Sequence, residues 1–318
     1  MQAVETVFMA DTERKIEKLH MFQKAKVKIG ISPIGWTNDD LPELGNHISF
    51  ERCISEMEEA GYEGCEIGNK FPKDPIELKE RLAEHGLVAC NEWFPTYFTS
   101  HPYEYTLELF KKQCQKMKAV NGRIIGASEQ GNSIQTKKIP IFGEDKPVYS
   151  SEEWRIILKG YNEMGKIARE NGLWFSVHHH MGTGIQTEEE IDRLMEYSDP
   201  EYVFLVFCIG HVCCAGIDPE RLLKKYVNRV RHVHLKDVRR EVREQAITQN
   251  MSFLDAVREG VFTIPGDGCV DYDPLFRILN ENAYEGFLLV EAEQDPIKAE
   301  PLTYAKRARN YVRKHTGL

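Results

Sequence analysis

The sequence predicts a single domain built as a parallel (β/α)8 barrel, and three observations support this fold class. Short apolar runs rich in β-branched and aromatic residues recur along the chain, and amphipathic segments separate them. Eight strands that are each followed by a helix favour a closed parallel sheet over an open one. The 318 residues, 42% of them hydrophobic, are enough for one substantial core, and barrels of this length commonly form one domain.

The eight strands are expected where the apolar runs fall. In chain order, the expected strands cover residues 27–32, 63–67, 87–91, 123–127, 173–178, 203–208, 230–235 and 286–291. Helix-start signals lie between them. Asp74 followed by Pro75 is typical of an N-cap and a first helical turn, and Gly86 closes that helix. Thr187 and Glu190 have the spacing of a capping box.

The loops after three of the strands carry information about function. The first strand leads into a polar loop, residues 33–40, that contains an aromatic residue and lacks a glycine-rich phosphate fingerprint. A dinucleotide site is therefore not expected. The long connections 129–149 and 236–271 follow the fourth and seventh strands. Both should rise from the C-terminal face of the barrel, where barrel enzymes keep their active sites.

Composition excludes several classes of function. Lys and Arg number 41 against 50 Asp and Glu, and this net charge of −9 argues against general nucleic-acid binding. The eight cysteines show no CxxC pair, so we expect reduced thiols in the core. The chain shows neither an apolar run of the ~20 residues that span a bilayer nor an apolar stretch within its first 20 residues. We therefore expect a cytoplasmic protein with an N-terminal arm, 1–20, and a barrel domain, 21–318.

Histidines gather at the predicted ends of strands five, six and seven. Six of the eleven lie in this part of the chain: His178, His179, His180, His211, His232 and His234. Side chains alternate along a strand, so His178 shares a face with His180, and His232 with His234. A single strand histidine is more often structural, but imidazoles from three neighbouring strand ends favour a divalent metal site. Glu291 follows three apolar residues at the end of strand eight and is expected to be another ligand.

The remaining candidates are a set of polar and aromatic residues near the strand ends. Lys236 can polarise a carbonyl or act as a base, although a surface lysine would fit the sequence equally well. His211 and Glu129 are the other candidate bases. The candidate substrate contacts are Trp36, Asn91, Trp93 and His179. Aromatic and polar groups together suit a hydroxylated ring, and any one of these residues could equally be packing.

Several motifs resemble those of the inosose dehydratase family, which belongs to the xylose-isomerase-like barrels. They are GISPIGWTNDD (30–40), HHHMGTG (178–184), Gly210-His211 before Ala215-Gly216, FLDAVREG (253–260), PGDG (265–268) and VEAEQDP (290–296). The resemblance covers residues 21–315 in the expected order. It implies dehydration of 2-keto-myo-inositol (scyllo-inosose) to a trihydroxycyclohexane-dione in myo-inositol catabolism.

The resemblance also implies a divalent ion, usually manganese or cobalt, held by one residue from each of strands five to eight. Those positions are His178 or His180, then Cys208, His234 and Glu291. Here the chain departs from the family, whose sixth strand typically ends Asp-Thr-Gly-His, whereas this one reads Cys-Ile-Gly-His at 208–211. Oxygen ligands suit manganese, while a thiolate suits zinc or cobalt.

The mechanism expected for this substrate has three parts: removal of an α-proton, stabilisation of the enolate and protonation of the departing hydroxide. Two alternatives stay open. One is a ketose epimerase or isomerase on the same barrel, and the other is a catalytically impaired sugar-binding homologue, for which position 208 is the argument. DNA repair is disfavoured by the negative charge. The expected partner is a small cyclic polyol ketone, without nucleic acid or membrane, and a homo-oligomer is left open.

Overall fold

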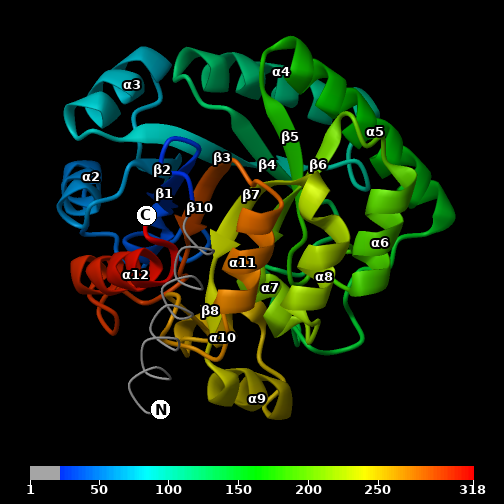
Figure 1. The fold of residues 1–318 in the computed structure, drawn as a ribbon. Coiled ribbons are helices and arrows are strands. Elements are labelled where there is room, and N and C mark those ends of the chain that lie inside the picture. Colours follow the sequence, from blue (N-terminus) through cyan, green and yellow to red (C-terminus); the bar gives the residue numbers. More distant parts are fainter. Residues whose placement is uncertain (1–21) are drawn as a thin grey trace, which may run out of the picture.

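The computed structural model describes residues 22–318 and shows the closed parallel barrel that the sequence predicts. The expected N-terminal arm, residues 1–20, lies outside the described residues. The strands follow one another around the barrel in the order β1-β10-β7-β6-β5-β4-β3-β2. Figure 1 shows them at the centre of the molecule with the helices around the outside.

The barrel strands fall close to the predicted positions. They are β1 (Val27–Ile31), β2 (Gly64–Ile67), β3 (Val88–Thr96), β4 (Ile124–Glu129), β5 (Trp174–His178), β6 (Val203–Cys208), β7 (Val230–Leu235) and β10 (Gly286–Val290). The largest difference is at β3, which continues to Thr96 although residues 87–91 were expected. Its first half pairs with β2 and its second half, from Asn91 onward, pairs with β4. The stagger between neighbouring strands that closes a barrel accounts for this long strand. The second half was not predicted because it contains Pro95, and proline is unusual inside a strand.

Helices follow the strands, and most of them bury one face against the barrel. They are α2 (Phe50–Glu59), α3 (Pro75–Glu84), α4 (Tyr103–Ala119), α5 (Ser151–Glu170), α6 (Glu188–Tyr197), α7 (Ile209–Cys214), α8 (Pro219–Tyr226), α9 (Arg240–Thr248), α10 (Phe253–Arg258), α11 (Asp273–Glu281) and α12 (Pro301–Thr316). The predicted caps are present: Asp74 accepts from two backbone amides of α3, and Thr187 and Glu190 form a complete capping box on α6.

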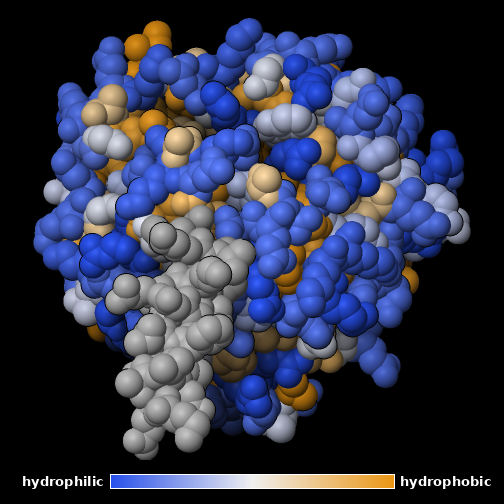
Figure 2. Space-filling view, in the orientation of Figure 1, coloured by the Kyte–Doolittle hydropathy of each residue, from blue (hydrophilic) through white to orange (hydrophobic). Residues whose placement is uncertain are grey.

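The main core fills the barrel and the layer between barrel and helices. Phe175 on β5, for example, contacts the rings of Phe110 on α4 and Tyr161 on α5. Parallel strands covered on both faces bury nearly all their side chains, as the fully buried β4 and β6 do. The face of the molecule shown in Figure 2 is mostly hydrophilic, with small scattered apolar areas. No helix within residues 22–318 is long and apolar enough to cross a membrane.

A second apolar cluster covers the C-terminal end of the barrel, and we call it the cover. Its buried members are Leu41, Ile134, Ile141, Met181, Cys214, Val238, Ala246, Phe253, Ala256, Val257, Val261 and Phe262. The segments after β4 and β7 contribute most of it, with α9 and α10 projecting from the ring of helices in Figure 1. The Ile141 amide donates to the Met251 carbonyl at 2.9 Å, which ties the two segments together. A short antiparallel pair, β8 (Asp237–Val238) and β9 (Phe262–Thr263), fixes the return of the chain to the barrel.

Candidate active site

Four possible metal ligands meet at the ends of four neighbouring strands. His178 ends β5, Cys208 ends β6, His234 lies on β7, and Glu291 follows β10. Their ligand atoms all lie within 4.8 Å of one another, and all four side chains are buried. We call this set the donor group. These strands are adjacent in the barrel, so residues distant in sequence converge at its mouth.

The register of the strands brings the donor group to one level. Cys208 pairs with His234 across β6 and β7, after a register shift at Leu205 and Val206. The Nδ1 of His234 lies 2.6 Å from the Oε2 of Glu291. The same Oε2 lies 3.9 Å from the sulfur of Cys208. Register shifts re-aim side chains and are frequent beside active sites. Here the shift sets the thiol and the imidazole opposite each other.

The donor group fits a divalent metal ion. Both ring nitrogens of His178 are buried and have no hydrogen-bond partner among residues 22–318. Such atoms are costly to bury unless a ligand satisfies them. Burial, helped by the neighbouring His234, holds the pKa of His178 well below its usual value, so its imidazole is neutral, the form that binds metals. Two imidazoles, a thiol and a carboxylate are a donor set that zinc and cobalt accept.

A second group of polar residues lies against the donor group and centres on Lys236. The Lys236 Nζ lies 2.5 Å from Glu293, 3.3 Å from Glu291 and 3.2 Å from the Nε2 of His211. We call His211, Lys236 and Glu293 the relay group. The surface position that the sequence also allowed for Lys236 is wrong, because this side chain is fully buried.

Electrostatics fix the protonation states of the relay group. Burial lowers the pKa of Lys236, but the Glu291 and Glu293 carboxylates outweigh it and raise that pKa above the usual lysine value. Lys236 is therefore a cation and does not have the lowered pKa that a lysine base needs. Burial holds the pKa of His211 well below its usual value, so this imidazole is neutral. Burial also raises the pKa of the Glu293 carboxyl, against the opposing effect of Lys236.

The structure separates the two histidines that were candidates for the ligand on strand five. His178 belongs to the donor group, whereas His180 lies with His211 and Glu293. The His180 Nδ1 is 2.8 Å from the Met181 carbonyl oxygen, and its ring packs against Phe253 of the cover. Burial lowers the pKa of His180 to about 3. Of the two, His178 is the one placed to complete a four-ligand site.

Glu129, the third candidate base, is not brought to either group. Its two carboxylate oxygens accept hydrogen bonds from the Thr96 hydroxyl, the Phe98 amide, the amide and hydroxyl of Thr99, and the Gly131 amide. These contacts tie the loop after β3 to the loop after β4. They are the contacts of a loop anchor, and they occupy both carboxylate oxygens.

Of the four candidate substrate contacts, Trp93 lies against the donor group. Its ring meets those of His178 and His180 edge to face, with centroids 5.3 and 5.8 Å away, and it keeps partial exposure. The other three bond to protein atoms. Trp36 donates to Glu56, Asn91 bonds to Glu66 and to the Gly126 amide, and the His179 Nε2 accepts from the Cys208 amide. These contacts hold the barrel wall together: His179 supports the backbone of Cys208, and Asn91 bonds to the Glu66 oxygen that contacts His234.

Sequence reasoning missed two carboxylates of the site. Glu293 follows Glu291 by two residues, so strand alternation alone puts both on one face. Glu66 interrupts the apolar strand β2, which is the same signal that singled out Glu291. Its Oε1 lies 3.1 Å from the His234 Nε2 and 3.8 Å from His232. Both residues were visible in the pattern and were not used.

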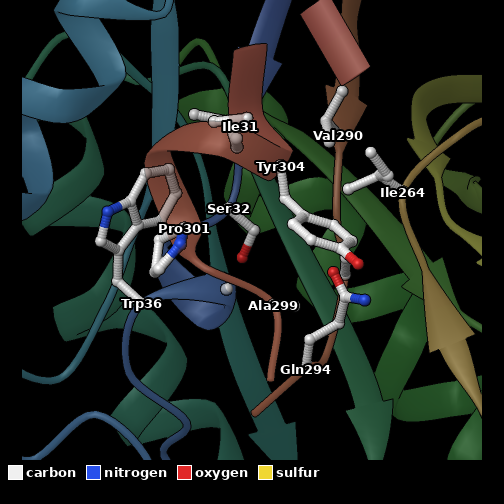
Figure 3. Close-up of a pocket in the computed structure, with 12 residues that line it drawn as sticks. Ile31, Ser32, Trp36, Ile264, Val290, Gln294, Ala299, Pro301 and Tyr304 are labelled. Carbon is white, nitrogen blue, oxygen red and sulfur yellow. The ribbon is translucent and has the colours of Figure 1, made fainter. Parts of the chain in front are cut away.

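A small cavity lies on the other side of the barrel wall. It is lined by Ile31, Val290, Ala292 and Tyr304, among others. Figure 3 shows the side chains of Ile31, Val290 and Tyr304 around it with those of Trp36 and Gln294. Val290 and Ala292 alternate with Glu291 and Glu293, so they face away from the donor group. The cavity of about 20 Å³ has room for one water molecule and not for a polyol.

The fold and the ligands at its strand ends define the class of protein. A family model described as xylose isomerase-like TIM barrel matches residues 54–315. Two solved structures share the fold. One is the IolI protein with a bound zinc atom, with a TM-score of 0.70 and 16% identity over 92% of this chain and 100% of that one. The other is a probable 3-DHS dehydratase from Bacillus anthracis, with a TM-score of 0.67 and 15% identity over 90% and 98% of the two chains.

More similar relatives narrow this class. Inosose dehydratase of Geobacillus thermodenitrificans is 52% identical over 94% of this chain and 100% of its own length. That of Clostridium tetani is 50% identical over the same shares, and that of Bacillus cereus is 46% identical. The chain belongs to the inosose dehydratase family of xylose isomerase-like TIM barrels.

Proposed function

We propose that this protein is a hydro-lyase that removes water from 2-keto-myo-inositol, giving a trihydroxycyclohexane-dione. The observation that carries the proposal is the contact between the donor group and the relay group at the barrel mouth, where Lys236 touches Glu291 of one and Glu293 of the other. The family membership agrees with it, since the relatives are named inosose dehydratases.

The substrate chemistry sets what the site must do. A ketone with an α-proton and a β-hydroxyl loses water when the proton leaves, the enolate is stabilised and the hydroxide is protonated. His178, Cys208, His234 and Glu291 would hold a divalent ion, and that ion would supply Lewis-acid stabilisation of the oxygen that becomes an enolate. The described side chains then have to provide a proton acceptor and a proton donor.

The relay group can supply both. The neutral His211 imidazole accepts the α-proton, the electron pair of the broken C–H bond forms the C=C bond, and the β C–O bond breaks. Because the α-carbon also carries a hydroxyl, the product of this step is an enol, which tautomerises to the dione. In its protonated form Glu293, whose pKa is raised by burial, gives a proton to the departing hydroxide. Lys236 holds a fixed positive charge between these two residues, 3.2 Å from His211 and 2.5 Å from Glu293. Return of the proton from His211 to Glu293 restores the starting state.

The cover excludes water from this chemistry. Phe253 packs on His180 and stacks over His211, and Phe262 meets His211 and Lys236. The donor and relay groups are nearly inaccessible beneath it. A dry site strengthens each electrostatic contact and protects the enolate. We propose that the cover opens to admit the substrate and that Trp93 contacts the ring of the substrate.

The metal, the cell compartment and the partners follow from the same proposal. The thiol of Cys208 within the donor group favours cobalt or zinc over manganese. A ketose epimerase with carboxylates on both sides of its metal is less well supported, because Glu291 is the one carboxylate of the donor group. We propose a cytoplasmic enzyme acting on a small cyclic polyol ketone, without nucleic acid.

The proposal is tested by stripping the purified protein with a chelator and restoring manganese, cobalt or zinc in turn. Dehydration of 2-keto-myo-inositol, followed by the ultraviolet absorbance of the diketone, is expected to return with at least one ion. Epimerised ketose without diketone would support the epimerase alternative. A metal-loaded protein that forms neither product would support an impaired sugar-binding homologue and overturn the proposal.

A further inference from the structure

Glu66 is a buried-strand carboxylate that the proposed chemistry does not use. It lies on β2, across the barrel from the strands of the donor group, yet its Oε1 reaches the Nε2 of His234 at 3.1 Å. On the opposite edge of the same imidazole, Nδ1 lies 2.6 Å from Glu291. The His234 ring is thus held between two carboxylates, one on each nitrogen.

Asn91 fixes Glu66 in this position. Its side-chain amide donates to the same Oε1 at 2.6 Å, and its carbonyl oxygen accepts from the Gly126 amide at 2.8 Å. The pairing of β2 with β3 shifts register between Cys65 and Glu66, so that Glu66 lies opposite Asn91 and not opposite Cys90. The contact between Glu66 and Asn91 depends on this shift, which re-aims a side chain toward the site.

We propose that Glu66, anchored by Asn91, is the positioning residue of His234: it accepts a hydrogen bond from Nε2–H, so that Nδ1 is left without a proton and faces the metal site. This inference rests on the metal centre of the proposed function. A histidine ligand that donates its other N–H to a carboxylate has a fixed ring orientation, a fixed tautomer and a more basic ligating nitrogen. Glu66 acts here through His234 and does not touch the ion.

The test compares Glu66→Gln with Glu92→Gln in the full chain. The glutamine side chain in Glu66→Gln keeps the shape and an acceptor oxygen but loses the charge that strengthens the bond to Nε2–H. Glu92 is on the neighbouring strand β3 and pairs with Lys116 at 2.6 Å, so its variant is the matched control. Metal affinity is measured by titrating cobalt or zinc against a competing chelator, and the coordination by the visible absorption spectrum of the cobalt protein.

We expect Glu66→Gln to weaken metal binding on the order of 10–100-fold, with the cobalt spectrum retained. Glu92→Gln should leave affinity and spectrum unchanged. Thermal melting of the metal-free proteins checks that both variants are folded, and a Glu66→Asp variant should recover part of the affinity because it restores the charge.

Three outcomes would overturn the inference, and they differ in what else they affect. Unchanged affinity in Glu66→Gln would remove the positioning role and leave the proposed function intact. A changed cobalt spectrum, or a second metal equivalent that disappears in the variant, would make Glu66 a direct ligand with His232 and His234. A wild-type chain that binds neither cobalt nor zinc would overturn this inference together with the metal centre of the proposed function.

Discussion

The donor group and the relay group lie side by side at the barrel mouth and differ in how their polar atoms are satisfied. In the donor group, both ring nitrogens of His178 are without a hydrogen-bond partner among the described residues. In the relay group, Lys236 has two carboxylates and an imidazole within 3.3 Å. One group is incomplete without a ligand, and the other is already a closed charge network.

Strand alternation explains how both groups arise from the same elements. His234 and Lys236 are two residues apart at the end of β7, and Glu291 and Glu293 are two apart after β10. Each of these strand ends therefore gives one residue to each group, on the same face and at successive levels. The donor group, whose polar atoms lack partners, is suited to binding a cation. The relay group, whose polar atoms are already paired, is suited to holding and moving protons.

The largest expected effect comes from breaking the donor group. His234→Ala or Glu291→Ala should abolish bound metal and reduce turnover to background, because each substitution removes one of the four metal ligands. Metal content of the purified variant and diketone absorbance measure the two effects, while circular dichroism checks that the barrel is retained. Full turnover in either variant would show that the ligand assignment is wrong.

Breaking the relay group should separate chemistry from metal binding. His211→Gln removes the proposed base, so we expect turnover to fall by about 10²–10⁴-fold while metal content stays at the wild-type level. Steady-state kinetics and metal analysis of the same preparation give both values. Loss of metal in this variant would show that the relay group is needed for metal binding and is not a separate group. Undiminished turnover would show that a residue other than His211 is the base.

Much of this arrangement could be predicted from the sequence, because it follows from periodicity. The strand ends are marked by apolar runs that stop at polar residues, so the barrel and the convergence of the histidines with Glu291 were predictable. The place of Cys208 among them was implied only by the resemblance to the family. Helix caps were equally visible, since a cap is a local contact. What alternation cannot decide is which of two same-face histidines, His178 or His180, is the ligand.

The remaining features depend on contacts between distant segments. Lys236 is a cation because Glu291 and Glu293 from another strand surround it, and its own neighbours in sequence give no sign of this. Glu129 is a loop anchor because the loop after β3 folds onto it. The position of Glu66 depends on a register shift between β2 and β3. The register of a strand depends on its pairing with its neighbours, so it cannot be predicted from the sequence of one strand.

The neutral imidazoles predict how the metal-free protein responds to acid. Burial holds their pKa values below that of an unfolded histidine, so below about pH 6.5 the unfolded chain binds more protons and stability falls as pH falls. These residues are His178, His179, His180, His211 and His232. His234 has the opposite sign: Glu291 and Glu66 outweigh burial and raise its pKa, so its contribution is present at low pH and lost as pH rises.

Five groups of one sign outweigh one of the other, so we expect a net loss on acidification. Each neutral imidazole contributes roughly 1 kcal/mol of destabilisation between pH 6.5 and 5.5. Urea unfolding of the metal-free protein at a series of pH values measures the free energy of unfolding directly. A flat profile across this range would mean that the imidazoles become protonated in the folded state, and the neutral forms assigned to His178 and His211 would be wrong.

The smallest expected effect concerns the choice of metal and comes from Cys208→Asp. The thiol lies 3.9 Å from Glu291 within the donor group. A carboxylate at this position restores the hard ligand typical of the family, so manganese affinity and turnover should rise, and zinc or cobalt binding should weaken. We expect the preference for manganese over zinc to change by about tenfold, roughly 1.4 kcal/mol. The assay is diketone absorbance with manganese, cobalt and zinc in turn.

Cys208→Ser is the matched control, because it removes the thiol without adding a charge. In the metal-free protein, Cys208→Asp places a second carboxylate beside Glu291, so its melting temperature should fall and then recover when an ion is added. Activity that appears only in Cys208→Asp would make the wild-type chain an impaired homologue. If neither substitution changes binding, turnover or melting with any metal, position 208 does not touch the ion, and the donor group reduces to the two histidines and Glu291.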